Sequence, residues 1–467
     1  MASATARQLT ALLTQERPRP ARIRERPGGW WLAVTTVCFG AFMGQLDASI
    51  VTLTYRGLGS DFHTSPAAVE WVSLAYLITL VALLVPVGRL ADAHGRKLFY
   101  LYGFVVFTAA SAACGLAPSL AALVVFRVVQ AAGAAMMQAN SVALVATSAP
   151  RERMRTALGV QAAAQALGLA LGPTVGGALV TTLGWRWVFG INVPIGVIAL
   201  VAGHYLLPRT RTRNRVPGFD WPGLALLAPA TTAGLLGVSA ASGLRVPGWA
   251  VGTLFAAAVA AGWGFAVRQG RAAAPLLDLG LLRRRAVSTG LAGALFGYLV
   301  LFGPLVLVPA ALTAAGRSEL TAGVVLTALP AGFAAAATGA DRVLPRGLPD
   351  RTRCLLGAGV CVAALAWLAA TGPAALGTLT AALAVLGLGL GLFTPANNTL
   401  IMSAIPAGSS GTGGGLVNMA RGLGTALGVA LVTLALHLTS ATGALVVLLA
   451  AGGAALVAAA LGPRTGR

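Results

Sequence analysis

The chain has 467 residues, of which 57% are hydrophobic and only 10% charged, whereas about 25% of the residues in a soluble domain are charged. This composition excludes a disordered chain, a collagen-like chain and a soluble globular domain, and it predicts an integral membrane protein. The formal net charge of +21 would suggest a nucleic-acid partner for a soluble protein, but the positions of the basic residues give the charge another meaning.

Long apolar runs follow one another along almost the whole chain. A run of about 20 residues is long enough to cross the hydrocarbon core as a helix. Fourteen such runs are present, which predicts fourteen transmembrane helices. They lie at residues 30–54, 67–88, 98–117, 119–147, 156–182, 187–207, 221–241, 248–267, 286–312, 320–340, 354–371, 374–404, 412–437 and 441–462.

The basic residues are distributed unevenly between the two sides of these spans. With the N-terminus inside, most of the 33 Lys and Arg fall in the tails and inner loops, and the outer loops hold only Arg56, Arg186, Arg245 and Arg317. This asymmetry follows the positive-inside rule and predicts that both termini are cytoplasmic. The charge is then a topological signal, and we expect no nucleic-acid partner. Lys97 is the single lysine, which suggests a GC-rich bacterial genome and hence a multi-pass protein of the bacterial inner (plasma) membrane.

Two pairs of segments repeat at long range. Residues 166–172 (ALGLALG) resemble residues 422–428 (GLGTALG), and residues 138–145 (QANSVALV) resemble residues 395–402 (PANNTLIM), at offsets of 256 and 257. Such repeats indicate duplicated halves, which leaves two spans over in the middle of the chain. We therefore expect a cytoplasmic basic tail at 1–29, a six-helix bundle at 30–207, two additional linker helices at 208–270, a second six-helix bundle at 271–463 and a cytoplasmic C-terminus at 464–467.

The segment after the second span, GRLADAHGRK, has the residue types of a gate. Glycine permits a close backbone approach, and an aspartate can pair with a basic group or with a helix N-terminus. We expect a short inner loop that latches two helical bundles together. The alternative is an ordinary hairpin whose charges only set the topology. The predicted gating residues are Gly88, Asp92, Gly95, Arg96 and Lys97.

Spans 1 and 4 each carry a charge at depth. Asp47 is the one carboxylate placed well inside a span, and Arg127 lies inside span 4 with Gln130 following it. A charge at that depth costs a few kcal/mol or more and needs a partner in the protein interior. At about 1.5 Å per residue, Asp47 and Arg127 reach similar levels on the outer side of the midplane. We therefore expect the two side chains to meet.

Span 5 contains the run GLALGPTVGG, rich in glycine around a proline. The glycines let another helix pack closely, and the proline introduces a kink or a flexible point. Simple helix packing is the alternative interpretation. The residues of this motif are Gly168, Gly172, Pro173, Gly176 and Gly177.

Together these motifs resemble signatures of the major facilitator superfamily. Residues 88–97 resemble its GxLaDrxGrr motif, with Ala93 where an Arg is usual, span 4 resembles its RxxQGxxxA motif, and span 5 resembles its antiporter-associated GxxxGPxxGG motif. LDASIV at 46–51 and WRWVFGINVPIG at 185–196 are similar to stretches of the fourteen-span drug:proton antiporters of the EmrB/QacA type.

The resemblance implies an all-α integral membrane protein with the major facilitator fold: two pseudo-symmetric six-helix bundles plus two extra central helices. It implies export of drug-like or antibiotic and secondary-metabolite compounds by alternating access, in exchange for protons. The alternative is a solute importer or facilitator on the same fold that is not coupled to protons.

Antiport requires a group whose proton affinity changes between two conformations, and Asp47 with Arg127 is our candidate. The alternative is that Asp47 forms a structural ion pair that never cycles. By the repeat, Gln165 corresponds to Arg421, so we expect these two side chains at one level on opposite sides of a cavity, with Asn418 one turn before Arg421. Arg421 either binds substrate or makes a buried structural contact.

One carboxylate against two arginines within the spans favours a neutral or acidic amphipathic substrate. The candidate cavity residues are Met43, Tyr76, Gln130, Gln165, Asn418 and Arg421. Further apolar wall candidates, of which we expect fewer than half to touch ligand, are Met137, Tyr298, Phe302, Phe333 and Phe393.

Residues for other chemistry are not apparent in the sequence. We find no nucleophile–base pair, metal-ligand spacing or nucleotide-binding loop, so we expect neither an enzyme nor a bound metal or cofactor, and energy from the proton gradient. The expected partners are an amphipathic small molecule, protons and the lipid bilayer, and we expect a monomer. The four cysteines show no disulfide pattern.

Overall fold

The computed structural model describes residues 16, 18–24, 28–210, 218–242, 247–317, 319–345, 347–372 and 375–463, and every regular element in that part of the chain is a helix. Fourteen helical segments there are long and apolar enough to cross a membrane, which confirms the predicted number. The predicted tail at 1–29 falls largely outside the described residues, and the predicted C-terminus at 464–467 falls wholly outside them.

Eleven spans are single helices, and three consist of two helices separated by a break. The bounds are α3 Trp30–Ile50, α5 Pro66–His94, α6 Arg96–Gly115, α7 Leu120–Ser148, α8 Met154–Thr182, α9 Arg186–Gly190 with α10 Asn192–Leu206, α11 Trp221–Ser242, α12 Gly248–Arg271, α14 Arg285–Phe302 with α15 Pro304–Ala314, α16 Glu319–Leu326 with α17 Ala328–Val343, α18 Asp350–Thr371, α19 Leu376–Ala404, α20 Ser410–Leu438 and α21 Ala441–Leu461. Shorter helices are α2 Ala21–Arg24, α4 Tyr55–Asp61 and α13 Leu279–Arg283, and the 3-10 turns are η1 Val51–Thr54, η2 Arg151–Arg153 and η3 Ala407–Ser409.

Three predicted spans are interrupted where we expected continuous helices. The breaks fall at Ile191, Gly303 and Thr327. A proline follows each break within three residues, at positions 194, 304 and 330. A proline ring removes one helical hydrogen bond and collides with the carbonyl four residues earlier, so each proline disfavours the turn that precedes it. Helix α8 is unbroken through Pro173, and a kink or flexible point there stays a prediction.

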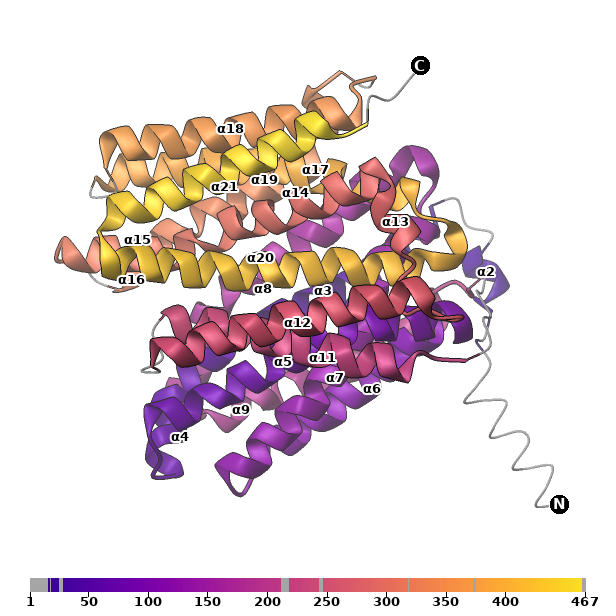
Figure 1. Cartoon of the computed structure of the whole chain (residues 1–467), viewed down its shortest axis with the longest axis horizontal. Coiled ribbons are helices and arrows are strands. Elements are labelled where there is room, and N and C mark those ends of the chain that lie inside the picture. Colours follow the sequence, from indigo (N-terminus) through magenta and orange to yellow (C-terminus); the bar gives the residue numbers. More distant parts are fainter. Residues whose placement is uncertain are drawn as a thin grey trace.

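The spans form two halves lying side by side (Figure 1). Helices α3 to α10 make one half and helices α14 to α21 make the other. Two crossing helices join them: α8 of the first half packs on α17 and α19, and α20 of the second half packs on α5 and α7. The first described helix, α2, and the end of α21 lie at the same end of the bundle in Figure 1, as an even number of spans requires.

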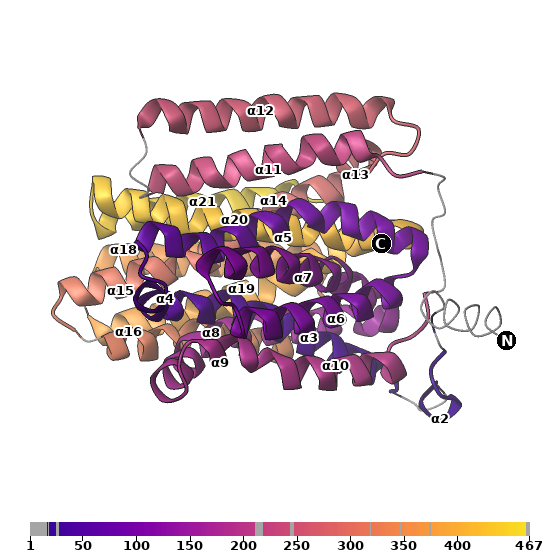
Figure 2. The same cartoon turned by 90° about the horizontal axis from the view of Figure 1, so that it is seen from below.

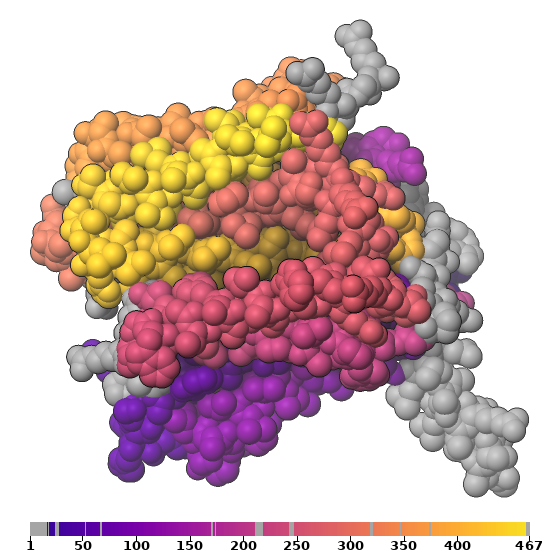
Figure 3. Space-filling view, in the orientation of Figure 1, coloured from indigo at the N-terminus to yellow at the C-terminus, as the bar shows by residue number. Residues whose placement is uncertain are grey.

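The two extra helices are central in the chain but peripheral in space. Helix α11 packs on α5 and α20, and α12 packs on α11. Figure 2 shows α12 at the outer edge with α11 between it and the bundle, and Figure 3 shows α12 on the outside of the front face. The side chains of Trp249, Val259 and Trp263 on α12 are more than 70% exposed. In a membrane these apolar side chains face lipid.

Asp220, directly before α11, ties the two extra helices together. Its carboxylate accepts hydrogen bonds from Arg268 Nε (3.0 Å) and Gln269 Nε2 (2.8 Å) of α12 and from the backbone N–H of Gly223 (3.1 Å). Burial by itself raises the pKa of Asp220, but these hydrogen bonds and the Arg268 charge outweigh it and hold the pKa below its usual range. The contact therefore stabilises the pair at neutral pH and is lost as the pH falls through that lowered pKa.

The glycines of the span 5 motif allow close packing between helices. A Cβ on Gly168 would lie 2.4 Å from the carbonyl oxygen of Phe42 in α3. The repeat reproduces this contact, because a Cβ on Gly424 of α20 would lie 2.1 Å from the carbonyl oxygen of Leu295 in α14. Gly172 and Gly176 also approach α3 or η1 closely, whereas Gly177 has no atom within 4 Å of its Cβ position. Three of the four motif glycines thus pack α8 against the first span.

We predict that Gly168→Ala destabilises the protein, because the new methyl group meets backbone that cannot move away. Overpacking of this kind costs about 1–3 kcal/mol. Gly177→Ala is the matched control: it adds a methyl group in open space, and alanine favours a helix over glycine by about 1 kcal/mol. Thermal unfolding in detergent measures both. Equal melting temperatures for the two variants would contradict the packing role of Gly168.

Candidate functional site

A fully buried polar cluster lies in the first half, centred on Asp47 of α3. Arg127 Nη1 of α7 donates to Asp47 Oδ2 over 2.6 Å, and Gln130 Nε2, one turn further along α7, donates to Asp47 Oδ1 over 3.0 Å. Asn192 Nδ2, at the start of α10, donates to the same oxygen over 2.8 Å. All four side chains are at most 1% exposed. The predicted meeting of Asp47 and Arg127 is therefore observed, whereas its role in proton coupling stays a prediction.

The remaining hydrogen bonds of this cluster hold Arg127 in place. Its Nη1 also donates to Gln130 Oε1 (2.7 Å), its Nε donates to the carbonyl of Val72 (3.1 Å), and its guanidinium lies 4.0 Å from the ring centroid of Tyr76. Gln130 in turn donates to Ser111 Oγ (2.7 Å). Side chains of α7 and α10 thus meet at one carboxylate of α3, and Arg127 and Gln130 connect it to α5 and α6.

Sequence reasoning missed Asn192 and Ser111. A charged residue inside an apolar run predicts a partner, because burying an unpaired charge is costly. A single Asn or Ser in such a run gives no comparable indication. One hint was available, because Asn192 lies in the stretch 185–196 that resembles the antiporter family and follows the helix break at Ile191.

Asp92 forms the first contact that closes one end of the protein. Its Oδ1 accepts from the backbone N–H of Gly411 (2.7 Å), and its Oδ2 accepts from the N–H (2.7 Å) and the hydroxyl (2.8 Å) of Thr412. These groups begin α20, so the carboxylate caps the positive end of a long helix from the other half. A Cβ on Gly88 would lie 2.4 Å from the carbonyl oxygen of Gly411. We call the contact of Asp92 and Gly88 with Gly411 and Thr412 the first latch.

The segment 88–97 is not the loop that we expected. Helix α5 continues to His94, so Gly88 and Asp92 lie on its last two turns, and only Gly95 (φ 125°) separates α5 from α6. Leu90, Ala91 and Ala93 favour the helix, and glycine alone adopts that φ without strain. Arg96 binds Asp92 Oδ1 (Nε, 2.9 Å) and the carbonyl of Ala407 (Nη2, 2.6 Å) across the boundary.

Lys97, predicted as a gating residue, has a different set of partners. Its Nζ donates to the carbonyls of His204 and Leu207 at 2.8 Å each, at the end of α10 in its own half. A cation there stabilises the C-terminal end of a helix.

A second latch, missed by sequence reasoning, lies at the same end. Asp341 in the last turn of α17 accepts from the Thr156 hydroxyl (2.8 Å) and from Arg155 Nη2 (3.0 Å) at the start of α8. Two residues at the start of α18 complete this latch. Asp350 pairs with Arg155 Nη1 over 2.8 Å, and Arg353 pairs with Asp341 Oδ1 over 2.9 Å.

The two latches are related by the internal repeat. Thr156 and Thr412 are 256 residues apart, the offset found for the repeated segments, and each donates its hydroxyl to an aspartate of the opposite half. The first latch is closed to solvent, with Asp92 0% exposed, whereas Asp341 is 34% exposed. Since exposed ion pairs are worth little, the first latch contributes more to closure.

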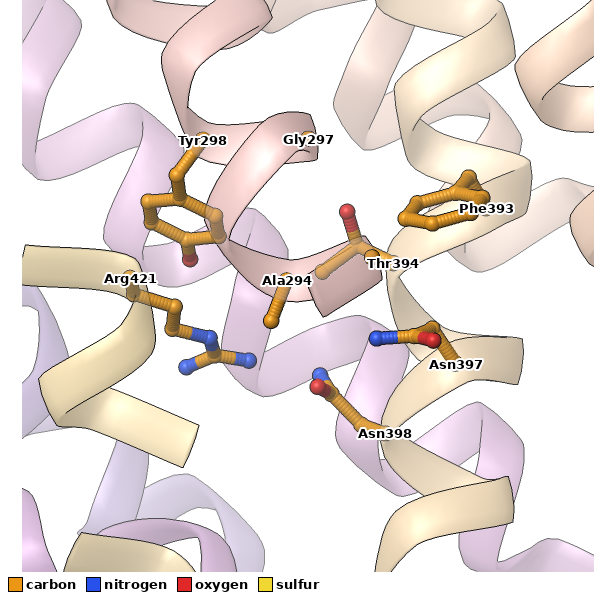
Figure 4. Close-up of a pocket in the computed structure, with 9 residues that line it drawn as sticks. Ala294, Gly297, Tyr298, Phe393, Thr394, Asn397, Asn398 and Arg421 are labelled. Atoms are coloured by element: carbon orange, nitrogen blue, oxygen red, sulfur yellow. The ribbon is translucent and has the colours of Figure 1, made fainter. Parts of the chain in front are cut away.

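A small pocket lies in the second half, between α14, α19 and α20 (Figure 4). Of the six predicted cavity residues, Arg421 lines it. Gln165 and Asn418 accept hydrogen bonds from Arg421 Nη1, each over 3.2 Å. The expectation that Gln165 and Arg421 face each other across a cavity is therefore wrong, because they bond directly. We call this cavity the Arg421 pocket; its other lining residues include Ala294, Tyr298, Phe393, Asn397 and Asn398.

The three remaining predicted cavity residues lie elsewhere. Met43, Tyr76 and Gln130 are fully buried within the first half, packed around the Asp47 cluster or in the hydrophobic core beside it. The sequence did not show which way each of these side chains points. Tyr298 and Phe393, two of the expected apolar wall residues, do line the Arg421 pocket.

Two repeated helical halves, latched at one end, with charged groups buried in the spans, define a membrane transporter. The chain belongs to the Major Facilitator Superfamily, whose family profile matches residues 37–429. Its fourteen spans fit the fourteen-span drug:proton antiporter type within that superfamily.

Characterised relatives extend over most of the chain. It is 33% identical over 416 residues to the tetracenomycin C resistance and export protein of Streptomyces glaucescens, covering 87% of this chain and 76% of that protein. It is 30% identical over 410 residues to the riboflavin transporter RibZ of Clostridioides difficile, covering 86% and 87%. Among solved structures, the human organic anion transporter MFSD10 superposes with a TM-score of 0.68 over 93% of this chain and 100% of that chain. Its sequence is 18% identical, so this likeness shows the fold alone.

We predict that Asp92→Asn opens the latched end. The amide loses the charge that caps α20 and one acceptor oxygen, which shifts the equilibrium towards the open state by about 5–150-fold. Spin labels at Glu152 and Val343, on opposite halves at that end, report the change as a longer distance. Asp341→Asn has a smaller effect because its latch is partly exposed.

Asp278→Asn is the control for this experiment. Asp278 is an exposed carboxylate that caps α13 within its own half (Gly280 N–H, 2.8 Å), so its loss leaves the distance unchanged. An equal lengthening in all three variants would show that the latches do not hold this end closed.

Proposed function

We propose that the protein is a proton-coupled exporter of drug-like or antibiotic and secondary-metabolite amphipathic compounds, working by alternating access. The observation that carries the proposal is the buried Asp47 cluster. Asp47 is a carboxylate at 0% exposure, held by donors from α7 and α10. The name of the Streptomyces glaucescens relative, a resistance and export protein, supports the direction of transport.

Protonation of Asp47 would rearrange the first half. A neutral carboxyl group cannot hold the Arg127 guanidinium as strongly as a carboxylate, so Arg127 would bind more weakly to α3. Helix α3 packs on α8 through the glycine contacts. Helix α8 carries Arg155 and Thr156 of the second latch and Gln165 beside Arg421. One helix therefore connects the proton site, a latch and the Arg421 pocket.

We place the protein in the bacterial inner membrane with both termini cytoplasmic, because the basic residues favour that orientation. The latched end then faces the cytoplasm, and the conformation is closed on that side. Opening outward would give Asp47 access to external protons, and opening inward would release them. The proton gradient supplies the energy, without a cofactor or metal, and a monomer suffices because both halves are in one chain.

An uncoupled facilitator or importer is the second candidate. It is favoured by the completeness of the Asp47–Arg127 pair, since a fully hydrogen-bonded ion pair also fits a purely structural role. The riboflavin transporter among the relatives is consistent with solute movement other than drug export.

We predict that Asp47→Asn abolishes coupling but keeps exchange. In proteoliposomes with an imposed pH gradient, uphill movement of tetracenomycin C falls by about tenfold or more in the variant. Counterflow of the same compound without a gradient is preserved, because the asparagine keeps the shape of the side chain. Riboflavin serves as a second probe.

Asp61→Asn is the matched control, since Asp61 is an aspartate 43% exposed that pairs with Arg186 near the opposite end. Its uphill transport stays at the wild-type level. Equal uphill transport by wild type and Asp47→Asn at every pH gradient would make Asp47 a structural partner of Arg127. Probe movement without proton movement in any variant would identify a facilitator.

A further inference from the structure

The buried charge of Arg421 has no counter-charge among the described residues. Its side chain is 3% exposed, and its Nη1 donates only to the neutral amide oxygens of Gln165 and Asn418. Its Nε and Nη2 are buried and have no hydrogen-bond partner in the described part of the chain. The Tyr298 ring, with its centroid 5.1 Å from the guanidinium carbon, offers a weak cation–π contact.

Arg127 in the other half is also a buried arginine, but its guanidinium has an anionic partner and several hydrogen-bond acceptors. At 1% exposure it holds a carboxylate, an amide oxygen and a backbone carbonyl. A buried ion left without its partner costs several kcal/mol, and a charge inside the spans is retained where function needs it. The difference between the two arginines indicates that the partner of Arg421 comes from outside the protein.

The unused atoms of Arg421 face a pocket with other unused polar atoms. Asn398 of α19 is 0% exposed, and neither its Nδ2 nor its Oδ1 has a partner among the described residues. Figure 4 shows the Arg421 guanidinium and the Asn398 amide directed towards the same space, with the Tyr298 and Phe393 rings beside it. Polar atoms that converge in this way on an apolar-walled cavity are typical of a ligand site.

The geometry of the free nitrogens selects the ligand chemistry. Nε and Nη2 lie on one edge of the guanidinium, the edge that binds both oxygens of a carboxylate. Asn398 can donate to the same oxygens or bind a neighbouring hydroxyl group, and the two rings suit a flat apolar body. We infer that the Arg421 pocket binds an ionised carboxylate group attached to the aromatic body of the transported compound.

The inference rests on the proposed transport function and adds the substrate class to it. The pocket is too narrow in this conformation for a drug-sized molecule, so it takes only the acidic group, while the aromatic body extends towards the boundary between the halves. Gln165 of α8 lies at that boundary and touches both Arg421 and the Tyr298 hydroxyl (3.2 Å). Binding of an anion therefore affects a contact between the two halves.

The experiment compares two probes of the same shape, 2-naphthoate and 2-naphthamide, on the purified full-length protein by isothermal titration calorimetry without a pH gradient. Wild type binds the acid more tightly than the amide. Arg421→Gln weakens binding of the acid by about 10–100-fold, the value of charge-assisted hydrogen bonds, and leaves the amide unchanged. Arg421→Lys restores part of the affinity because it keeps the charge and loses the two-nitrogen edge.

Thermal unfolding of the ligand-free variants separates binding from structure. Since the charge is unpaired, Arg421→Gln keeps or raises the melting temperature, whereas replacement of a structural arginine would lower it. Arg56→Gln, at an exposed arginine on α4, is the control and changes neither binding nor stability. Equal affinity of wild type for the acid and the amide, or loss of stability in Arg421→Gln with unchanged acid binding, would overturn the inference.

The outcome is independent of proton coupling. If uphill transport proves insensitive to Asp47 while Arg421 still selects the acid, the inference stands and antiport fails. If antiport holds while the acid and the amide bind alike, antiport stands and the inference is overturned.

Discussion

The structure depends on one constraint: a charged side chain inside hydrocarbon must be neutralised, because an unpaired ion there is costly. The two arginines within the spans meet this constraint differently. Arg127 is neutralised by Asp47 in its own half, whereas Arg421 has only neutral amides for partners among the described residues. A proton that binds Asp47 would remove the counter-charge of Arg127, and an anion that binds Arg421 would supply the counter-charge that Arg421 lacks. In the proposed function, the protein exchanges this proton for this anion.

The two halves meet through a pair of crossing helices that the repeat relates, α8 and α20. Helix α8 and its repeat partner α20 each pack on the first span of their own half through a glycine contact and begin at a latch formed with the other half. This reciprocal arrangement gives the two halves matching contacts, so the closed end can open by a movement of one half against the other. The latches also differ in burial, which makes the Asp92 contact the stronger of the two.

The sequence predicted the features that carry a large physical penalty. Apolar runs long enough to cross the bilayer predict membrane helices. Asp47 and Arg127 carry opposite charges at a similar depth, and this predicted that they would pair. Features without such a penalty escaped prediction. The helical nature of residues 88–94 depends on weak propensities, the direction of Met43 and Tyr76 depends on helix rotation, and the role of Asn398 depends on which atoms remain unpartnered after folding. The latch at Asp341 was missed because its partners Arg155 and Thr156 lie 186 and 185 residues away in the chain.

The most direct test of the central claim, that protonation of Asp47 controls the closed end, measures the Glu152–Val343 spin-label distance as a function of pH in the absence of substrate. The account predicts that the distance distribution of the wild type shifts with pH and that Asp47→Asn, whose side chain cannot ionise, loses this shift. An identical pH response in the two proteins would contradict the claim.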